Sequence, residues 1–355
     1  MPRPRSSHVT MQDVARHAGV SAQTVSNVVN GRSARVGAPT RDRVIASITA
    51  LGYRVNQTAR SLRRGRTGTI GLGLPTFDSE YYAGLAEELS HRFLERGFRL
   101  VVMHTGGAVR TEVDSLASSR LDAYDGFVLA LAAGDAEHLA QIDTTTPIVL
   151  LGERALSSGL DHVLMDNIGG ARRATELLLQ RGARDIVALG GTARDEETMP
   201  GLRMRGFRDA HDAMGVAPDP SLIVPCTFDQ QGGYDGVRGL IAEGREIDAV
   251  FAMTDGIAFG AMRALADAGI RVPDDAQVIG FDNVRAGRFS IPRLSTIEPD
   301  NAARAESIAE LLTSRIDGSE ADPARRIVTH PATIVERETT LSAPREQKSP
   351  GKNRG

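Results

Sequence analysis

From residue 69 onward, the chain alternates between short runs of apolar residues and longer stretches in which apolar residues recur every three or four positions. The short runs predict strands, and the amphipathic stretches predict helices between them. Alternation of this kind is typical of an α/β fold with a parallel sheet. The predicted strands cover residues 69–74, 99–104, 126–131, 148–151, 185–190, 249–253 and 278–282. The clearest helices cover residues 81–97, 169–182, 201–215 and 256–269.

A different pattern occupies residues 10–55, where three short helices are predicted without a strand. The first begins after Thr10, a suitable N-cap, and ends at Gly19, which supplies the left-handed position that closes a helix. Ser21 begins the second, Thr40 signals the third, and Gly52 ends it. Their apolar faces are Met11, Val14, Ala15 and Ala18; Val25, Val28 and Val29; and Val44, Ile45, Ile48 and Leu51. This order predicts a helix-turn-helix domain.

The exposed face of the second helix carries small and amide side chains where a solvated helix usually carries lysine and glutamate. Ala22, Gln23, Ser26 and Asn27 lie on this face. Glutamine and asparagine suit bidentate hydrogen bonding to adenine in the DNA major groove. The alternative is an ordinary solvated helix in a small three-helix domain.

Net charge favours the DNA interpretation, because it divides the chain into a basic segment and an acidic remainder. Residues 1–66 contain twelve arginines, no lysine and two acidic residues, Asp13 and Asp42, so they carry a formal charge of +10, against −3 for the whole chain. A basic helical domain favours a nucleic-acid partner, and an acidic body favours a smaller ligand. Four arginines that flank the second and third helices are expected to meet phosphates: Arg32, Arg35, Arg41 and Arg43.

Residues 56–66 are too short and too basic to form a core of their own. Asn56 can cap a short helix in which Ala59 and Leu62 share one face. An isolated helix of this length is marginal in water, because nucleation costs more than so few residues return. We expect a segment that is disordered in the free protein and ordered on DNA. A flexible basic linker is the alternative.

Polar or aromatic residues follow nearly every predicted strand of the body, where open α/β sheets bind ligands. The candidates for ligand contact are Phe77, Asp78, Glu153, Arg154, Asp166, Arg203, Phe228, Thr254, Asp255 and Asp282. Carboxylates, one arginine and a flat apolar face suit a hydroxyl-rich, uncharged ligand, since each buried polar group needs a partner. Asp166, Thr254 and Asp255 also stand at predicted helix starts, so N-capping is an alternative role for them.

Several contiguous motifs resemble one family. The blocks VTMQDVARHAGVSAQTVSNVVNG and PTRDRVIASITALGYRVNQTARSLRRGRTGTIG are similar to the DNA-binding head and hinge of the LacI/GalR repressors. The later motifs RMRGFRDA, MTDGIAFGAMRALADAG and VIGFDN are similar to their effector domain, in the same order. Two positions of the head and hinge depart from the common pattern, since Asn27 stands where many members have arginine and Val55 replaces a proline. In the effector domain, Thr254 stands where asparagine commonly precedes the aspartate.

The resemblance implies how the head contacts DNA. Residues 22, 23 and 27 are implied to read bases in the major groove. Leu62 is implied to insert as an apolar wedge at a central base step in the minor groove, with Ala59 allowing close approach. The implied DNA contacts are Thr10, Ser21, Ala22, Gln23, Thr24, Ser26, Asn27, Asn30, Asn56, Ala59, Leu62 and Arg63.

The resemblance also implies the fold class: an all-α helix-turn-helix head and an α/β two-lobed effector domain of the periplasmic-binding-protein type I. The expected ranges are a disordered N-terminus at 1–9, the head at 10–55, the hinge helix at 56–66, the effector-binding and dimerisation domain at 67–341, and a disordered tail at 342–355. Lobe crossings are expected near Met165, Ile297 and Gly318. They give one lobe of 69–165 with 297–318 and another of 167–295 with 321–341.

The implied function is a cytoplasmic homodimeric repressor of carbohydrate-utilisation genes, released from a pseudo-palindromic operator by a sugar-like effector. A non-sugar effector, an activator or corepressed repressor, and an enzyme with a DNA-binding head stay open. Glu197 stands where purine-binding relatives carry arginine, which argues against a purine corepressor. No apolar run is long enough to cross a membrane. With one cysteine, Cys226, and scattered histidines, neither a metal site nor a cofactor is expected.

Overall fold

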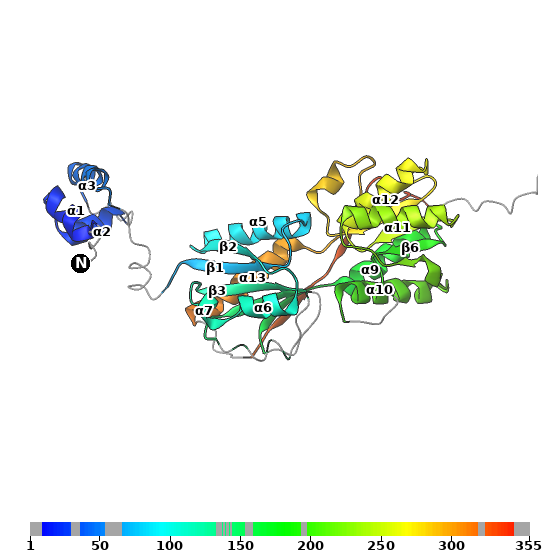
Figure 1. Ribbon diagram of the computed structural model, residues 1–355, viewed down its shortest axis with the longest axis horizontal. Helices are drawn as coiled ribbons and strands as arrows, with labels where there is room; N and C mark the ends of the chain where they lie inside the picture. Colours follow the sequence, from blue (N-terminus) through cyan, green and yellow to red (C-terminus); the bar gives the residue numbers. More distant parts are fainter. Residues whose placement is uncertain are drawn as a thin grey trace, which may run out of the picture. The chain divides into compact units, whose positions relative to one another are not determined.

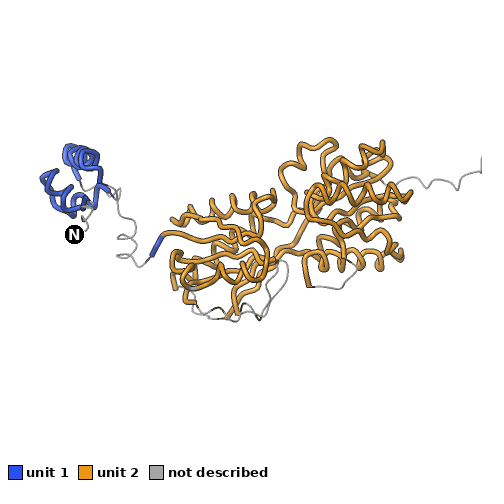
Figure 2. Tube along the Cα trace, viewed as in Figure 1, with its two compact units in different colours: residues 1–67 blue, residues 68–355 orange. Residues whose placement is uncertain are grey.

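The computed structural model describes residues 9–29, 36–53, 66–132, 144–152, 159–192, 197–318 and 324–343, together with residues 137, 139 and 142. The chain divides into two compact units, residues 1–67 and residues 68–355, which Figure 2 colours separately. Several predictions lie outside the described residues: those for both chain ends and for Asn30, Arg32, Arg35, Asn56, Ala59, Leu62, Arg63, Glu153 and Arg154.

The first unit contains three helices in its described part, α1 (Met11–Ala18), α2 (Ala22–Val29) and α3 (Ala38–Leu51) (Figure 1). α1 begins at its predicted cap: the Thr10 hydroxyl accepts a hydrogen bond from the Asp13 N–H at 3.3 Å, and Asp13 accepts one from the Thr10 N–H at 2.9 Å. Gly19 and Gly52 end α1 and α3 at φ 63° and 62°, the left-handed region that favours glycine. Both predicted stops are confirmed.

The start of α3 differs from the prediction. The helix begins at Ala38, two residues before Thr40, with Gly37 as N-cap and Pro39 in its first turn. Proline is well tolerated there, because its missing N–H has no partner inside the helix. The proline therefore moves the helix start toward the N-terminus of the segment.

The core of the head centres on Val14, Val25 and Val44, which are fully buried. Ile45 was predicted to join them, but it is 49 % exposed. Ser47 takes the buried position instead, because residues three apart share a helix face and adjacent residues do not. His17 Nδ1 lies 2.9 Å from the Ser47 hydroxyl, and this contact joins α1 to α3.

The second unit contains two six-stranded sheets, one in each lobe (Figure 1). The first sheet has the order β11-β5-β4-β3-β1-β2, and its paired strands are parallel. The second has the order β12-β10-β9-β8-β6-β7 and is parallel except for the pair β10 and β12. The strands are β1 (Thr69–Leu74), β2 (Arg99–His104), β3 (Gly126–Leu131), β4 (Ile148–Gly152), β5 (Asp161–Met165), β6 (Ile186–Leu189), β7 (Ile223–Val224), β8 (Ala249–Ala252), β9 (Gln277–Phe281), β10 (Ser295–Glu298), β11 (Ile327–His330) and β12 (Thr333–Val335).

Helices cover both faces of each sheet. α5 packs with α13 in the first lobe, while α9 pairs with α10 and α11 pairs with α12 on opposite faces of the second sheet. The helices are α5 (Glu80–Glu95), α6 (Val109–Ser115), α7 (Ser118–Leu121), α9 (Asn167–Gln180), α10 (Met199–Met214), α11 (Gln230–Ala242), α12 (Asp255–Asp267) and α13 (Asn301–Asp317), with the 3₁₀ turns η2 (Pro220–Leu222) and η3 (Arg285–Arg288). Within the described ranges, no helix is long and apolar enough to span a membrane.

Strand β3 shows why the central strands read as continuous apolar runs. Its side chains alternate between two apolar clusters: Val128 packs with α5 residues such as Leu85, whereas Phe127 packs with Leu116 and Leu121. A strand that is buried on both faces needs apolar residues at every position. The predicted bounds of β1, β2 and β3 are confirmed without a shift.

The chain passes between the lobes three times. It crosses at Asp166 between β5 and α9, after Glu298 between β10 and α13, and between β11 and β12. The third crossing corrects the position expected near Gly318, because β11 pairs with β5 in the first lobe and not with the second lobe. β11 is a four-residue edge strand with alternating exposure, so its local pattern is weak and its pairing depends on a distant strand.

Candidate effector cleft and DNA-binding helix

The outer face of α2 presents the side chains that were predicted to read bases. Ala22 and Gln23 are exposed, and Asn27 is half-buried. The Gln23 amide donates a hydrogen bond to Asn27 Oδ1 at 3.3 Å, one helical turn away. Ser21 caps the helix, since its hydroxyl accepts from the Thr24 N–H at 3.1 Å. The helix therefore begins with a solvent-facing row of hydrogen-bonding groups.

The second unit has a cleft of about 620 Å³ at the carboxyl ends of the strands. Both lobes contribute to its walls. The lining residues from the first lobe are Thr76, Asp78, Ser79, Glu80, Tyr81, Tyr82 and Ala132. Those from the second lobe are Met199, Arg203, Phe228, Asp229, Gln230, Gln231, Thr254, Gly256, Phe259, Asp282 and Val284.

Arg203 of α10 forms the charged floor of this cleft and is only 1 % exposed. Its Nε donates to Asn167 Oδ1 at 2.8 Å, and Nη1 donates to the carbonyl oxygen of Met253. Its Cζ lies 3.6 Å from the centroid of the Phe281 ring, so the guanidinium covers the aromatic face. These contacts hold the side chain in one orientation.

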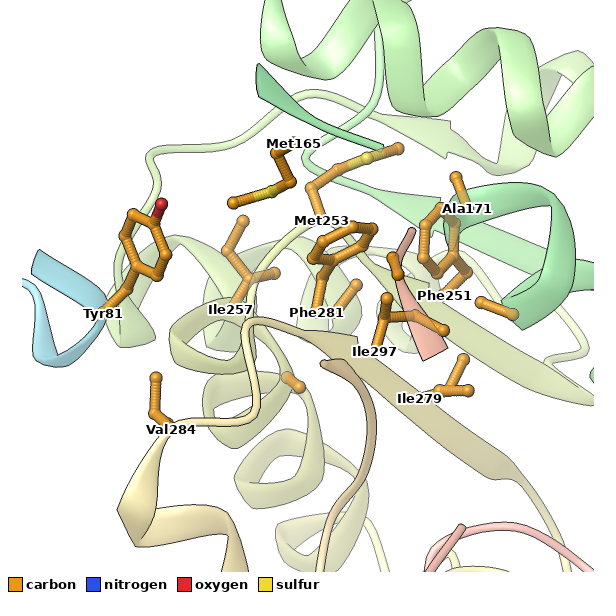
Figure 3. Close-up of a cluster of buried hydrophobic side chains, with 14 of the residues drawn as sticks. Tyr81, Met165, Ala171, Phe251, Met253, Ile257, Ile279, Phe281, Val284 and Ile297 are labelled. Carbon is orange, nitrogen blue, oxygen red and sulfur yellow. The ribbon is translucent and has the colours of Figure 1, made fainter. Parts of the chain in front are cut away.

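Apolar side chains surround that arginine. Figure 3 shows Met165, Met253 and Phe281 in one cluster, and the Met165 sulfur lies 3.2 Å from Arg203 Nη2. Removing a charge from water is costly unless it is paired. The pairing comes from Asp282, whose carboxylate lies 3.7 Å from Arg203 Nη2 and is itself almost buried.

Asp282 follows β9 in an unusual backbone conformation. Its φ is 114°, and that of Asn283 is 48°, both in the region that non-glycine residues rarely adopt. The Asp282 N–H donates to the Ile297 carbonyl at 2.8 Å, which ties this turn to β10. The turn directs the chain away from the sheet while Asp282 remains in the lining of the cleft.

Five of the predicted effector residues line the cleft. Arg203 and Asp282 form its floor, and Asp78, Phe228 and Thr254 contribute to its walls. The Phe228 ring is 48 % exposed, which leaves an apolar face open to a ligand. The Thr254 hydroxyl also caps α12 by accepting from the Ile257 N–H at 3.2 Å, so the predicted capping role is confirmed for a residue that also lines the cleft.

Three predicted effector residues do not line the cleft. Asp166 caps α9 through the Gly169 N–H and pairs with Arg173 at 2.7 Å. Asp255 is fully buried beneath the turn that follows β9. Phe77 is mostly exposed and packs on His104, with the ring centroids 5.5 Å apart.

Sequence reasoning missed several lining residues. Tyr81 and Tyr82 lie in the first turn of α5, and Gln230 and Gln231 in the first turn of α11. All four sit where a helix begins beyond the carboxyl edge of a sheet. Their position in the first turn of a helix that follows a predicted strand is the sequence signal that could have found them.

The Glu197 carboxylate, which was expected to disfavour a purine ligand, lies outside the lining of the cleft. It pairs with Arg205 at 2.5 Å. Among the described residues, no group of three histidine, cysteine or acidic side chains is placed to hold a metal ion. The cleft therefore offers carboxylates, amides, hydroxyls and aromatic faces as its chemistry.

Comparison with known proteins assigns both units. Residues 10–56 match the lacI family of bacterial regulatory proteins, and residues 175–340 match the periplasmic binding protein-like domain. The chain is 32 % identical to the HTH-type transcriptional repressor PurR of Pectobacterium carotovorum subsp. carotovorum (strain PC1), over 94 % of this chain and 98 % of that protein.

Solved structures agree with this assignment. A LacI-family transcriptional regulator from Sanguibacter keddieii DSM 10542 is 36 % identical, with a TM-score of 0.71 over 78 % of this chain and 99 % of that chain. A CelR–cellobiose complex is 30 % identical, with a TM-score of 0.67 over 93 % of this chain and 99 % of that chain. The predicted family and fold class are confirmed. The chain therefore belongs to the lacI family of bacterial regulatory proteins and is a transcriptional regulator.

Proposed function

We propose that the protein is a homodimeric repressor whose affinity for operator DNA falls when a small sugar-like effector binds in the cleft. The observation that carries this proposal is the buried Arg203–Asp282 pair at the floor of a cleft shared by two lobes. A ligand that contacts both lobes favours one separation of the lobes over another, and this preference is what shifts a two-state equilibrium. The effect passes to the DNA-binding heads and requires no catalytic step.

The cleft suits a hydroxyl-rich ligand. Asp282 and Arg203 offer a fixed acceptor and donor, and Phe228 offers an exposed ring on which the apolar face of a sugar can stack. Asp78 and Thr254 add hydrogen-bonding groups on opposite lobes. The related CelR has been solved with cellobiose, which supports a carbohydrate as the first class to test.

A thermal-shift screen tests the effector class. Cellobiose, ribose and a panel of polyols are expected to raise the melting temperature in proportion to RT ln(1 + [L]/Kd). The ligand that does so is then added to the protein on a DNA fragment from the promoter next to its own gene, where release is expected. Stabilisation by no carbohydrate in the panel would reject the sugar assignment.

A purine corepressor is the second candidate, because Glu197 pairs with Arg205 and does not line the cleft, and because Phe228 presents a flat ring. Adenine, guanine and hypoxanthine therefore belong in the same screen. A purine that stabilises the protein and strengthens operator binding would replace the sugar proposal.

For the DNA-binding head, we propose that Gln23 and Asn27 read bases and that Leu62 opens the central base step. Gln23→Ala is expected to weaken operator binding at specific base pairs, with non-specific binding unchanged. Leu62→Gly is expected to abolish tight operator binding while non-specific, salt-dependent binding persists. Operator affinity equal to that of the wild type would reject either assignment.

We propose that two copies pair through exposed apolar residues of the second unit. Val101 and Val102 are partly exposed on β2, an edge strand, and Leu94 of α5 is largely exposed. Phe289 and Ile291 add a second exposed apolar site in the other lobe. Sedimentation is expected to show a dimer for the wild type and a monomer for the double variant Leu94→Lys with Val101→Lys.

A further inference from the structure

Asp255 is a buried carboxyl group that the effector cleft does not use. It is the first residue of α12 and is 0 % exposed. Its Oδ1 accepts a hydrogen bond from the Thr296 hydroxyl at 2.6 Å, and its Oδ2 accepts one from the Val284 N–H at 2.8 Å. Val284 follows Asp282 by two residues in the same turn, and Thr296 lies in the neighbouring strand β10.

That turn needs external support, because two successive residues have positive φ. Non-glycine residues with such dihedrals persist where the surrounding structure holds them. The Asn283 N–H donates to the Thr296 hydroxyl at 3.2 Å, next to the bond from Thr296 to Asp255. Asp255 and Thr296 thus hold the two amides that directly follow Asp282.

Gly280 allows the carboxyl group to reach this position. A Cβ atom on residue 280 would lie 2.1 Å from Asp255 Oδ1, far inside any normal contact. β9 therefore leaves a space beside the turn, and the Asp255 carboxyl group occupies it. The close fit is between Asp255 and the backbone that leads to Asp282, and not between Asp255 and the cleft.

We propose that Asp255 is a positioning residue for the effector site: it holds the turn at residues 282–284 so that the Asp282 carboxylate faces the cleft and Arg203, and it does not contact the effector. This inference rests on the proposed function, because it assigns Asp282 as the effector contact. It replaces the expectation that Asp255 contacts the ligand directly.

The chemistry of the pocket identifies asparagine as the conservative replacement. Burial and the neighbouring Asp282 carboxylate raise the pKa of the Asp255 carboxyl well above its usual range, so a neutral side chain suits the site. An asparagine oxygen can accept from the Val284 N–H, and its amide can donate to the Thr296 hydroxyl. Alanine can do neither.

The first experiment needs no ligand. Amide hydrogen exchange of the full-length protein is measured for Asp255→Asn, Asp255→Ala and Thr296→Val, with Asp267→Ala on the surface of the same helix as the matched control. Asp255→Ala and Thr296→Val are expected to speed exchange at residues 282–284 by about tenfold, the effect of losing one buried hydrogen bond. Exchange in β3 of the other lobe is expected to stay unchanged, and Asp255→Asn and the control are expected to match the wild type.

Unchanged exchange at the turn in Asp255→Ala and Thr296→Val would overturn the inference. An equal increase in the turn and in β3 would do the same, because it would show a general loss of stability. If Asp255→Ala fails to fold, Thr296→Val carries the measurement, since it removes the bonds from Thr296 to Asp255 and from the Asn283 N–H to Thr296 with little change in shape.

The second experiment uses cellobiose binding measured by calorimetry. Asp255→Ala is expected to weaken binding by about tenfold, while Asp255→Asn retains it. An Asp255→Asn variant that keeps the turn protected but loses cellobiose would show direct contact and overturn the inference. If wild-type protein does not bind cellobiose, that probe fails as the proposed effector, whereas the exchange measurement still decides whether Asp255 holds the turn.

Discussion

The carboxylate of Glu80 in α5 accepts a hydrogen bond from the backbone N–H of Ala286 in η3, at 2.9 Å, and this bond joins the two lobes beside the cleft. Glu80 lines the cleft from the first lobe, whereas η3 follows the Asp282 turn in the second. A direct bond between lobes restricts how far they separate. The bond therefore contributes to the equilibrium between open and closed lobes, which an effector shifts.

Loss of the Glu80 bond is expected to weaken effector binding. Glu80→Ala removes the acceptor and lowers the population of closed lobes, so affinity for the stabilising ligand is expected to fall about fivefold, the effect of roughly 1 kcal/mol. Glu80→Gln keeps an acceptor for the Ala286 N–H and serves as the matched control. Calorimetry checks the affinities, and equal values for Ala and wild type would show that the bond does not affect closure.

Arg203→Ala is expected to lower stability and to remove the effector response. The substitution removes a buried side chain that contacts Asn167, the Met253 carbonyl and the face of Phe281, and it removes the ion pair with Asp282. We expect the free energy of unfolding to fall by about 3 kcal/mol. Urea unfolding measures that loss, and the ligand-induced shift in melting temperature measures the response.

Arg172→Ala is the control for the Arg203 variant, because Arg172 is exposed and forms a surface ion pair with its helix neighbour Glu176. It is expected to change stability by less than about 1 kcal/mol and to keep the ligand response. A ligand response in Arg203→Ala equal to that of the wild type would exclude Arg203 from the effector site.

Asp255→Asn is expected to gain stability relative to the wild type as pH rises. Burial raises the folded-state pKa of Asp255 above its unfolded value, so this group contributes stability below pH 3.8 that is lost as pH rises through the folded pKa. Asparagine does not titrate. As pH rises, the unfolding free energy of the variant is therefore expected to increase relative to that of the wild type. The increase is about 1.4 kcal/mol for each unit by which the pKa of Asp255 is raised.

Urea titrations of both proteins at several pH values between 4 and 9 check this prediction. Taking the difference cancels the titrations that the two proteins share, such as that of His211, whose pKa is lowered by burial. A difference that stays constant with pH would show that Asp255 keeps its ordinary pKa in the folded protein.

Cys226 is expected to react slowly with thiol reagents in the folded protein. Burial, with the nearby Asp229 carboxylate, raises the pKa of its thiol to about 11. At pH 8 only about one thiol in a thousand is then ionised, and the thiolate is the reactive form. Reaction with a disulfide reagent is expected to be about two orders of magnitude faster in urea, and an equal rate in both states would contradict this prediction.

Local sequence determined many of the helices and strands of this protein. The buried strands β1 and β3 follow from continuous apolar runs, the exposed edge strand β2 follows from a shorter one, and α1 follows from the Thr10 cap and from Gly19. Each of these signals acts within a few residues, through side-chain periodicity, capping or the conformational freedom of glycine. These elements can therefore be predicted from the residues within them and next to them.

Tertiary structure decided which of the polar residues at strand ends reach the cleft. Asp255 and Asp282 both follow a buried strand, yet one carboxyl group is buried under a turn and the other lies in the lining. Likewise β11 joins the first sheet through a partner strand far away in the sequence. Capping, buried support and ligand contact require the same polar residue types at the same local positions, so only the packing of distant segments separates them.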